Sequence, residues 1–454
     1  MQNACPSHAA VLRYPAFQPT SWLLTQATLE VIRASPVFAS LRQGAYPVRL
    51  AIIGAGEQGY VLTWNLARLP NIDEIVVADA EMERASEVAA RVGGGKARAA
   101  KADACDVEQV ASLAAGSDLI LNAVIPECDE ALMRAALRAK THYQDMATRV
   151  DGGTIEDGFL MQLGMDEEFR AINRTALVHT GMTPGVTNTL AAIGYEELDH
   201  CEEVRIKGGG LFRSEVPIQV WSQETYYIDS QTPSLYFDDG KFLRAEPFAG
   251  WEEFDFPQPV GRTPVTFHEH EECATLPRFL PKLGDKGLRH VDFKLGGSEE
   301  SLKKAKTIVE MGLASPKPRL VKGVSVRPID VLVSVLPPTS PREEIARMAR
   351  EGRIVDEGVY VIDLYAHAGE PPAESFYVFP PNIQWVTERL PGANRISYGT
   401  STPAAIYAEY LLEGRIAEKG VLPCEGLSRE TRLAYIEELT RRGLRIARRS
   451  MRWT

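Results

Sequence analysis

A glycine-rich turn between an apolar segment and a helix constrains the fold of this chain more than any other feature. Val48–Ile53 is a short apolar run with β-branched residues at both ends, which predicts a buried strand. Gly54, Gly56 and Gly59 follow at once in the pattern G-x-G-x-x-G, and residues 60–69 are predicted to form a helix that a proline ends. The first glycine allows a tight turn, the second lets the backbone approach a pyrophosphate, and the third permits close helix–strand packing. A tight turn without a ligand is the alternative, but the flanking strand and helix favour a dinucleotide site.

The next predicted strand, 74–79, ends in a carboxylate that indicates which dinucleotide is bound. Asp79 lies 20 residues after Gly59, where an acidic side chain can accept hydrogen bonds from the adenosine ribose. The same charge repels a 2′-phosphate, and residues 80–83 offer no Arg or Lys, so we expect NAD rather than NADP. In such sheets, further cofactor contacts gather at later strand ends. The other cofactor-binding residues that we predict are Glu57, Gln58, Asp106, Asn122, Ala123 and Pro126.

Strands and helices alternate with short connections as far as about residue 200. Strands are predicted at 74–79, 118–122, 143–145 and 176–179, and helices at 82–92 and 129–140. This alternation predicts an α/β fold with a Rossmann-type, doubly wound parallel sheet. Later segments are richer in proline and aromatic residues and alternate in polarity, which predicts an antiparallel α+β domain. We expect an N-terminal arm at 1–47, the Rossmann domain at 48–200, the α+β domain at 201–400 and a helical C-terminal part at 401–454.

Composition and charge exclude several classes of protein. The formal net charge is −11, from 50 Lys and Arg against 61 Asp and Glu, so we expect no nucleic-acid partner. No apolar run approaches the ~18 residues of a membrane span, and the first residues lack a secretory pattern, so a cytoplasmic protein without a membrane partner is expected. Six cysteines without metal-ligand spacing predict free thiols in a reducing compartment. They are Cys5, Cys105, Cys128, Cys201, Cys273 and Cys424.

Several short segments, taken in order, are similar to one enzyme family. After the glycine motif they are 105–107 (CDV), 122–126 (NAVIP), 143–145 (YQD), 181–188 (GMTPGVTN), 269–271 (EHE), 275–277 (TLP), 402–405 (TPAA) and 420–423 (GVLP). Together they resemble the saccharopine dehydrogenase family over about residues 48–427. The resemblance implies a split Rossmann domain to which the C-terminal helix returns, and an inserted α+β domain for substrate binding and dimerisation. It also implies NAD(P)-dependent oxidation of a C–N bond in an amino acid, or the reverse reductive amination.

One loop indicates which type of enzyme within this family the chain resembles most. Thr183 is followed by Pro184 and Gly185, which looks more like the lysine 6-dehydrogenase type, since saccharopine reductases tend to carry an Asp at the first position. The leading expectation is therefore NAD-dependent oxidative deamination of lysine or a similar diamino acid. The alternatives are reductive condensation of an amine with an aldehyde or keto acid, a homospermidine synthase-like transfer, and NAD binding without catalysis. We expect a small amino acid or amine as the substrate, and a homodimer or higher homo-oligomer.

Hydride removal from an amine carbon requires a neutral amine, so a base should lie near the substrate nitrogen. Asp166 is a candidate by resemblance, because saccharopine reductases have an Asp at the start of the helix before this loop; an acid there also suits the helix dipole alone. Asp145 ends a predicted strand and should face the crevice, unless it caps the next segment. His179 also follows a strand, and a structural histidine is its alternative.

Substrate contacts are predicted on the loop and in the second domain. Thr183 and Asn188 can hydrogen-bond the substrate or the cofactor carboxamide, or cap the helix that follows. Arg213 is a candidate for a substrate carboxylate, as are Arg262 and Arg289, because a guanidinium forms a paired contact with a carboxylate.

His270 belongs to a run of His and Glu at 268–272. If this run is a strand, alternate residues point to opposite faces and only His268, His270 and Glu272 converge. Hydride transfer to a nicotinamide needs no metal. We therefore expect no metal site and assign His270 to substrate binding.

Overall fold

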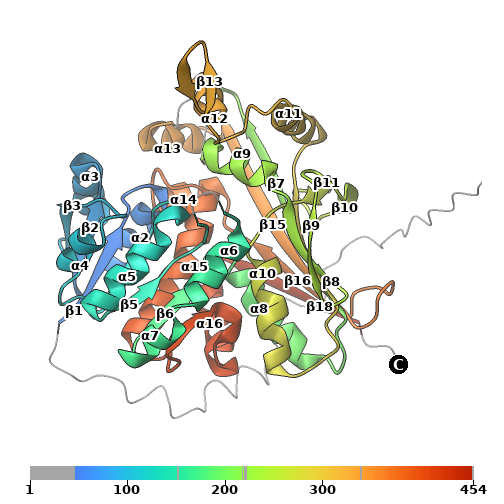
Figure 1. The fold of residues 1–454 in the computed structure, drawn as a ribbon, viewed down its shortest axis with the longest axis horizontal. Coiled ribbons are helices and arrows are strands. Elements are labelled where there is room, and N and C mark those ends of the chain that lie inside the picture. The colour runs from blue at the N-terminus through green and yellow to red at the C-terminus, as the bar shows by residue number, and fades with distance from the viewer. Residues whose placement is uncertain (1–46, 151–152, 217, 219–221, 338–339, 452–454) are drawn as a thin grey trace, which may run out of the picture.

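Two β-sheets, each flanked by helices, organise the molecule (Figure 1). The computed structural model describes residues 47–150, 153–216, 218, 222–337 and 340–451. All but the last position of the predicted arm at 1–47 lies outside the described residues. Within those ranges, no helix is long and apolar enough to cross a membrane.

The first sheet has seven strands in the order β17-β6-β5-β4-β1-β2-β3. All of its neighbouring pairs are parallel, which confirms the predicted sheet. The strand order reverses at β1, so a crevice forms at the carboxyl ends of β1 and β4. The strands are β1 (Val48–Ile53), β2 (Ile72–Asp79), β3 (Ala97–Lys101), β4 (Leu119–Asn122), β5 (His142–Gln144), β6 (Thr175–Val178) and β17 (Gly420–Pro423).

Helices cover this sheet with their apolar faces. In α3, for example, Ala85, Val88 and Val92 recur at helical spacing and are buried, while the other face is charged. Late in the chain, α15 packs against α2. The helices that belong with this sheet are α2 (Glu57–Ala67), α3 (Met82–Val92), α4 (Val107–Leu113), η2 (Pro126–Cys128), α5 (Asp129–Ala139), α6 (Ile155–Leu163), α7 (Asp166–Ala171), α8 (Val186–Glu197), α15 (Arg395–Leu412), η4 (Cys424–Gly426) and α16 (Arg429–Arg441).

The second sheet is mixed and has nine strands, with the main order β10-β11-β12-β7-β15-β16-β18 and β8 and β9 at its side. Its centre is a long antiparallel pair, β7 with β15, while β12 runs parallel to β7. The strands are β7 (Glu203–Ser214), β8 (Ser234–Asp238), β9 (Lys241–Ala245), β10 (Glu252–Asp255), β11 (Arg262–Phe267), β12 (His290–Gly296), β15 (Ile354–Tyr365), β16 (Glu374–Phe379) and β18 (Arg445–Ser450).

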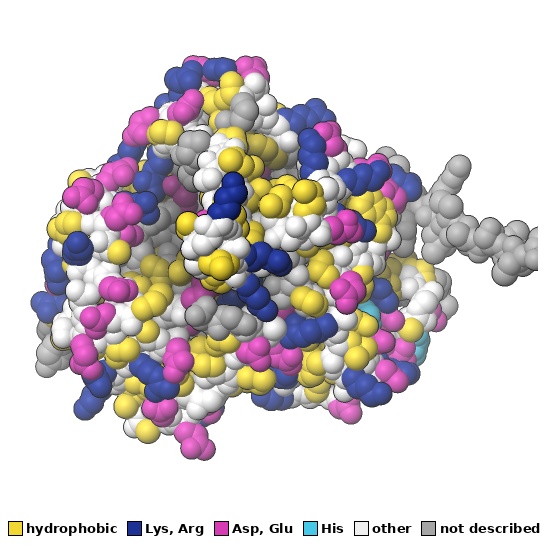
Figure 2. All heavy atoms as spheres, turned by 45° about the horizontal axis from the view of Figure 1, so that its top comes forward, with side chains coloured by type: hydrophobic (Ala, Val, Ile, Leu, Met, Phe, Trp, Pro, Cys, Tyr) yellow, Lys and Arg dark blue, Asp and Glu magenta, His cyan; other side chains and the backbone are white. Residues whose placement is uncertain are grey.

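Several helices and one hairpin surround the second sheet, so this domain holds more helix than its sequence suggested. On the face in Figure 2, acidic and basic side chains are interspersed. The elements are α9 (Gln223–Gln231), α10 (Glu272–Phe279), η3 (Leu280–Leu283), α11 (Glu299–Glu310), β13 (Arg319–Val321), β14 (Val324–Val326), α12 (Pro328–Val335), α13 (Arg342–Arg350) and α14 (Ile383–Arg389).

The end of the chain contributes to both sheets. It was expected to be a helical tail, but β17 joins the first sheet beside β6, and β18 pairs with β16 of the second. The tail prediction is wrong for these two segments, because each pairs with a strand from an earlier part of the chain, which the local sequence does not reveal. Helices α15 and α16 and the short 3-10 helix η4 are helical as expected.

The prediction of free thiols is wrong for two cysteines. Cys105, before α4, and Cys128, in η2, form a disulfide. Helices α4 and α5, which follow these cysteines, pack against each other and bring together residues 23 apart in sequence, which spacing alone did not indicate. Cys201, Cys273 and Cys424 are free and buried, and Cys5 lies outside the described residues.

Candidate active site

The glycine turn after β1 has the shape that a dinucleotide requires. Gly54 adopts a φ of +109°, and a Cβ there would lie 2.4 Å from the carbonyl oxygen of Ala123. A Cβ on Gly59 would lie 1.9 Å from the carbonyl oxygen of Gly54, so only glycine lets α2 pack this close to β1. A Cβ on Gly56 would meet nothing within 4 Å. Open space therefore faces the start of α2, and the residues present fit a pyrophosphate bound at the helix N-terminus.

Asp79 lies beside this turn at the end of β2. Its Oδ2 accepts a hydrogen bond from the Ala55 amide at 2.8 Å, and its Oδ1 accepts one from the Glu81 amide at 2.9 Å. The carboxylate is thus fixed next to the glycine turn, where a ribose is expected. Arg84 is the residue that could compete by holding a 2′-phosphate, and it forms an ion pair with Glu81 at 3.1 Å.

The first turn of α2 is in contact with more distant parts of the chain. Oε1 of Glu57 lies 3.1 Å from Nη2 of Arg342, which begins α13 in the second domain. Gln58 accepts a hydrogen bond from Ser401 of α15. Both predicted cofactor residues therefore border the turn, with their side chains bound to protein partners.

Two other predicted cofactor residues hold the loops of the crevice in place. Asp106 is the N-cap of α4 and accepts a hydrogen bond from the amide three residues on, at 3.0 Å. Asn122, at the end of β4, donates to Oδ1 of Asp129 at 2.7 Å and to the Tyr143 hydroxyl at 3.0 Å. Pro126 begins η2, which follows the same loop.

Asp145 lies just after β5 and is only 1% exposed. Its Oδ1 accepts a hydrogen bond from the His179 amide at 2.7 Å, and its Oδ2 accepts one from Nε2 of Gln162 at 2.6 Å. Burial raises the pKa of Asp145 to about 8, although the His179 amide opposes this. A carboxyl group at a strand end that exchanges its proton near neutral pH is a candidate for acid–base chemistry.

The run at 268–272 reaches the same place from the second domain. It is not a strand, because β11 ends at Phe267 and α10 begins at Glu272, so the predicted alternation of side chains is wrong. Nδ1 of His270 lies 2.6 Å from Oε2 of Glu272 and 3.3 Å from Oε2 of Glu271. Oε1 of Glu271 accepts a hydrogen bond at 3.1 Å from the amide of Thr148, on the loop after β5. The two domains therefore meet at Glu271.

In this cluster His270 and Glu272 form an ion pair, and Glu271 is the group that can change its protonation. Burial lowers the pKa of His270, but the Glu272 carboxylate outweighs it and raises the value to about 9. Despite burial, His270 in turn lowers the pKa of Glu272. Burial raises the pKa of Glu271 to about 7, although His270 opposes the shift, and Glu271 itself helps to raise the pKa of Asp145. Near neutral pH, Glu271 and Asp145 are thus the carboxyl groups poised to exchange protons.

The 181–188 loop is tied to this cluster from the first domain. Thr183, which precedes a cis proline, donates a hydrogen bond to Oε1 of Glu272. Asn188, in the first turn of α8, donates to Thr275 at 2.9 Å and to Oε1 of Glu425 at 3.1 Å. Thr183 therefore borders the cluster, whereas Asn188 links three elements of the fold.

His179 lies next to Asp145, but its ring is not suited to carry protons. It is fully buried at a φ of +61°, and neither ring nitrogen has a hydrogen-bond partner among the described residues. Burial lowers the pKa of His179 to about 3. Its amide, rather than its ring, contacts the Asp145 carboxylate, so the ring is neutral in this setting.

Asp166 and Arg213 lie apart from the cluster. Oδ2 of Asp166 is 2.7 Å from Nε of Arg170, and its Oδ1 accepts a hydrogen bond from the Val421 amide at 2.8 Å. Val421 is near the amino end of β17, whereas the crevice lies at the carboxyl ends of the strands. The expectation that Asp166 handles protons is corrected on this ground. Arg213 is exposed near the end of β7.

Two important groups were missed by the sequence reasoning. Glu271 lies within the run at 268–272, but a strand there would place its side chain on the face opposite to His270 and Glu272. Arg149, on the loop after β5, is partly buried and forms an ion pair with the partly buried Asp229 of α9. No spacing rule connects residues that come from different domains. His270, Glu271 and Glu272 also place ligand atoms within 4.8 Å of one another, so this group could hold a metal ion.

Comparison with known proteins agrees with both domains. The model of the saccharopine dehydrogenase NADP binding domain matches residues 50–177, and that of the saccharopine dehydrogenase C-terminal domain matches residues 181–444. The chain belongs to the saccharopine dehydrogenase family. It is therefore an oxidoreductase with a nicotinamide-cofactor domain, as the resemblance in its sequence implied.

The individual relatives are distant in sequence, but each match covers most of this chain and nearly all of the relative. A carboxyaminopropylagmatine dehydrogenase from Synechocystis sp. is 24% identical over 86% of this chain and 96% of its own length. A carboxynorspermidine synthase from Vibrio cholerae is 26% identical over 83% of this chain and 91% of its own. Saccharopine dehydrogenase (L-Glu forming) from Saccharomyces cerevisiae has the same fold, with a TM-score of 0.64 at 14% identity over 89% of this chain and 100% of that one.

Proposed function

We propose that this protein is an NAD-dependent dehydrogenase that joins an amine to an aldehyde or keto acid by reductive condensation. The observation that carries the proposal is the pair Asp145 and Glu271, two buried carboxyl groups with raised pKa values at the junction of the domains. The relatives named as carboxyaminopropylagmatine dehydrogenase and carboxynorspermidine synthase favour this reaction over the lysine deamination first expected. Deamination of a diamino acid becomes the second candidate.

The proposed reaction needs two proton transfers, and the site offers two groups for them. The amine must be neutral to attack the carbonyl carbon, so one carboxylate takes a proton from it. The adduct must then lose water, so a protonated carboxyl group gives a proton to the leaving hydroxyl. Bound NADH supplies the hydride that reduces the resulting iminium carbon. Asp145, with a pKa of about 8, is the more protonated of the two near neutral pH and suits the proton donor. Glu271, with a pKa of about 7, is more ionised and suits the acceptor.

Other side chains position or bind groups in this scheme. The Glu272 carboxylate holds His270 and accepts a hydrogen bond from the Thr183 hydroxyl, which fixes the first turn of α10 beside Glu271. Arg149 is a partly buried guanidinium close in sequence to Asp145, and we assign to it the carboxylate of the keto acid or amino acid. That role replaces the one first given to Arg213.

NAD is the proposed cofactor, rather than NADP. Asp79 fills the position for the ribose hydroxyls beside the glycine turn, and its negative charge disfavours a 2′-phosphate. Arg84, the residue that could reverse this preference, is paired with Glu81.

The experiment is an absorbance assay with purified protein and NADH. Amines are offered in pairs with small aldehydes and keto acids, and NADH consumption that requires both partners supports condensation. In the reverse test, NADH formation from NAD and lysine alone would replace the proposal with oxidative deamination. Product formation with no net change in NADH would instead indicate a transfer reaction that recycles the cofactor.

A further inference from the structure

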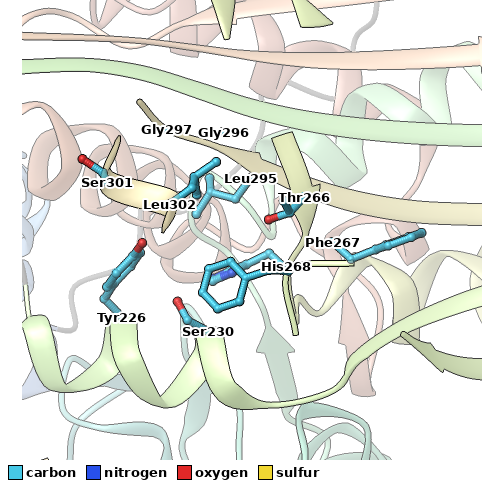
Figure 3. Close-up of a pocket in the computed structure, with 11 residues that line it drawn as sticks. Tyr226, Ser230, Thr266, Phe267, His268, Leu295, Gly296, Gly297, Ser301 and Leu302 are labelled. Carbon is cyan, nitrogen blue, oxygen red and sulfur yellow. The ribbon is translucent and has the colours of Figure 1, made fainter. Parts of the chain in front are cut away.

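A small pocket lies in the second domain, between α9, β11, β12 and the start of α11 (Figure 3). Figure 3 shows the Ser230 hydroxyl and the His268 imidazole pointing into it, with Leu295 and Leu302 on the far side. Tyr226 and Phe248 complete its apolar part. The pocket thus has a hydrocarbon wall and a small polar end.

This pocket adjoins the proton-handling cluster through shared elements. On α9, Ser230 follows Asp229, which is bound to Arg149 beside the candidate active site. His268 lies two residues before His270, and their ring centroids are 6.3 Å apart. The pocket and the cluster therefore lie next to each other, joined by α9 and by the segment 268–272.

Among the described residues, the lining contains no Asp, Glu, Lys or Arg. His268 is 8% exposed, and its ring nitrogens form no hydrogen bond with any other described residue. Burial, followed by the charges of His270 and Arg149, lowers the pKa of His268 to about 3. The imidazole is therefore neutral, and it offers one donor and one acceptor to a ligand.

A charged group would bind poorly in such a pocket. A buried ammonium would lose its water without gaining a carboxylate from the described lining. In the adjoining cluster, Glu272 is already paired with His270 and Asp229 with Arg149. Aromatic faces recover only about 0.5–2 kcal/mol for a cation. A carboxylate would likewise find no cation in the lining. A hydroxyl group can instead exchange water for Ser230 and His268 at little cost.

We propose that this pocket binds the far arm of the amine substrate, and that this arm is an uncharged carbon chain ending in a hydrogen-bonding group such as a hydroxyl. This inference rests on the proposed function for its reacting end. The inferred substrate therefore differs from diamines and amino acids, whose far ends are charged.

The test compares three amines of equal length, namely aminopentanol, diaminopentane and aminopentanoate, by titration calorimetry against the full-length protein with saturating NAD. Aminopentanol is expected to bind at least ~10-fold more tightly than the other two, which corresponds to about 1.4 kcal/mol. Equal binding of all three, or tightest binding of diaminopentane or aminopentanoate, would overturn the proposal. The wild-type protein alone decides this point.

Two variants at Ser230 test whether this pocket is the origin of the selectivity. Ser230→Asp places a carboxylate at the polar end and should reverse the order in favour of diaminopentane, whereas Ser230→Leu should weaken binding of all three. Ser334→Asp, on the exposed side of α12, adds the same charge elsewhere and should leave the order unchanged. An unchanged order in Ser230→Asp, together with undiminished binding in Ser230→Leu, would place the binding site elsewhere and reject the pocket. Selective binding without turnover of any amine and carbonyl pair would refute the proposed reaction and leave the pocket standing.

Discussion

Glu271→Gln is the substitution that most directly tests the electrostatic reasoning. The glutamine keeps the shape of the side chain and its Oε1, so it can still accept the hydrogen bond from the Thr148 amide. What it removes is the proton that Glu271 exchanges. The variant should therefore fold and bind NADH, but its turnover should fall by ~10²–10⁴-fold and lose the limb of the pH profile near neutral pH.

The same substitution has a thermodynamic consequence whose sign can be worked out. The pKa of Glu271 rises from its ordinary 4.5 to about 7 on folding, so the folded state holds this proton more tightly than the unfolded state. The stability that this provides is complete below pH 4.5 and is lost as the pH rises through 7. At about 1.4 kcal/mol per pKa unit, the loss in the free energy of unfolding is at most about 3 kcal/mol. Glu271→Gln does not titrate and should not show this loss.

The assay is urea unfolding at pH 5 and pH 8 for wild type and variant. Between these two values, the wild-type protein should lose more stability than Glu271→Gln does. Glu272→Gln is the matched control with the opposite sign, because His270 lowers the pKa of Glu272, and removing that charge should destabilise the protein at neutral pH. If the wild type and Glu271→Gln show the same dependence on pH, the carboxyl group is not held as described.

Four further predictions follow from the site and its surroundings. Asp79→Ala should weaken NADH binding and reduce the preference over NADPH in a fluorescence titration; tighter binding of NADPH by the wild type would contradict the assignment. Gly56→Ala should leave the melting temperature nearly unchanged while weakening cofactor binding, whereas Gly59→Ala, whose Cβ would lie 1.9 Å from a backbone oxygen, should lower the melting temperature. Asp166→Asn should lower stability through its lost contacts with Arg170 and β17 but leave kcat within about twofold, and a ~10²-fold fall in kcat would restore its catalytic role. A homo-oligomer formed through the second domain is expected, and a monomeric mass by light scattering at micromolar concentration would argue against it.

The first domain could be predicted because its signals are local. In Val48–Ile53 and the glycine turn, each residue's role depends on neighbours within a few positions, and α3 has the bounds 82–92 that its spacing indicated. The end of the chain was harder. Residues 445–450 carry four polar side chains among six, so nothing local marks them as β18, which forms because β16 offers a free edge.

The site was only partly predictable for a related reason. Asp145 could be proposed because parallel strands end at one edge, a rule that needs only the position of a strand. Glu271 depends on a contact with Thr148, more than a hundred residues away, and its pKa depends on burial that only the assembled domains create. The prediction for Asp166 was wrong for the opposite reason. The position of its helix could be predicted, but the end of the sheet beside which this residue lies could not.

The placement of β17 and β18 bears on how the protein is made. Strand β17 completes the first sheet and β18 the second, and both come from the segment after residue 419. Until residues 420–450 have left the ribosome, each domain therefore exposes an unpaired strand edge. Before that point β6 and β16 are available to mispair with other chains. A premature stop codon before residue 420 would leave both domains incomplete at once.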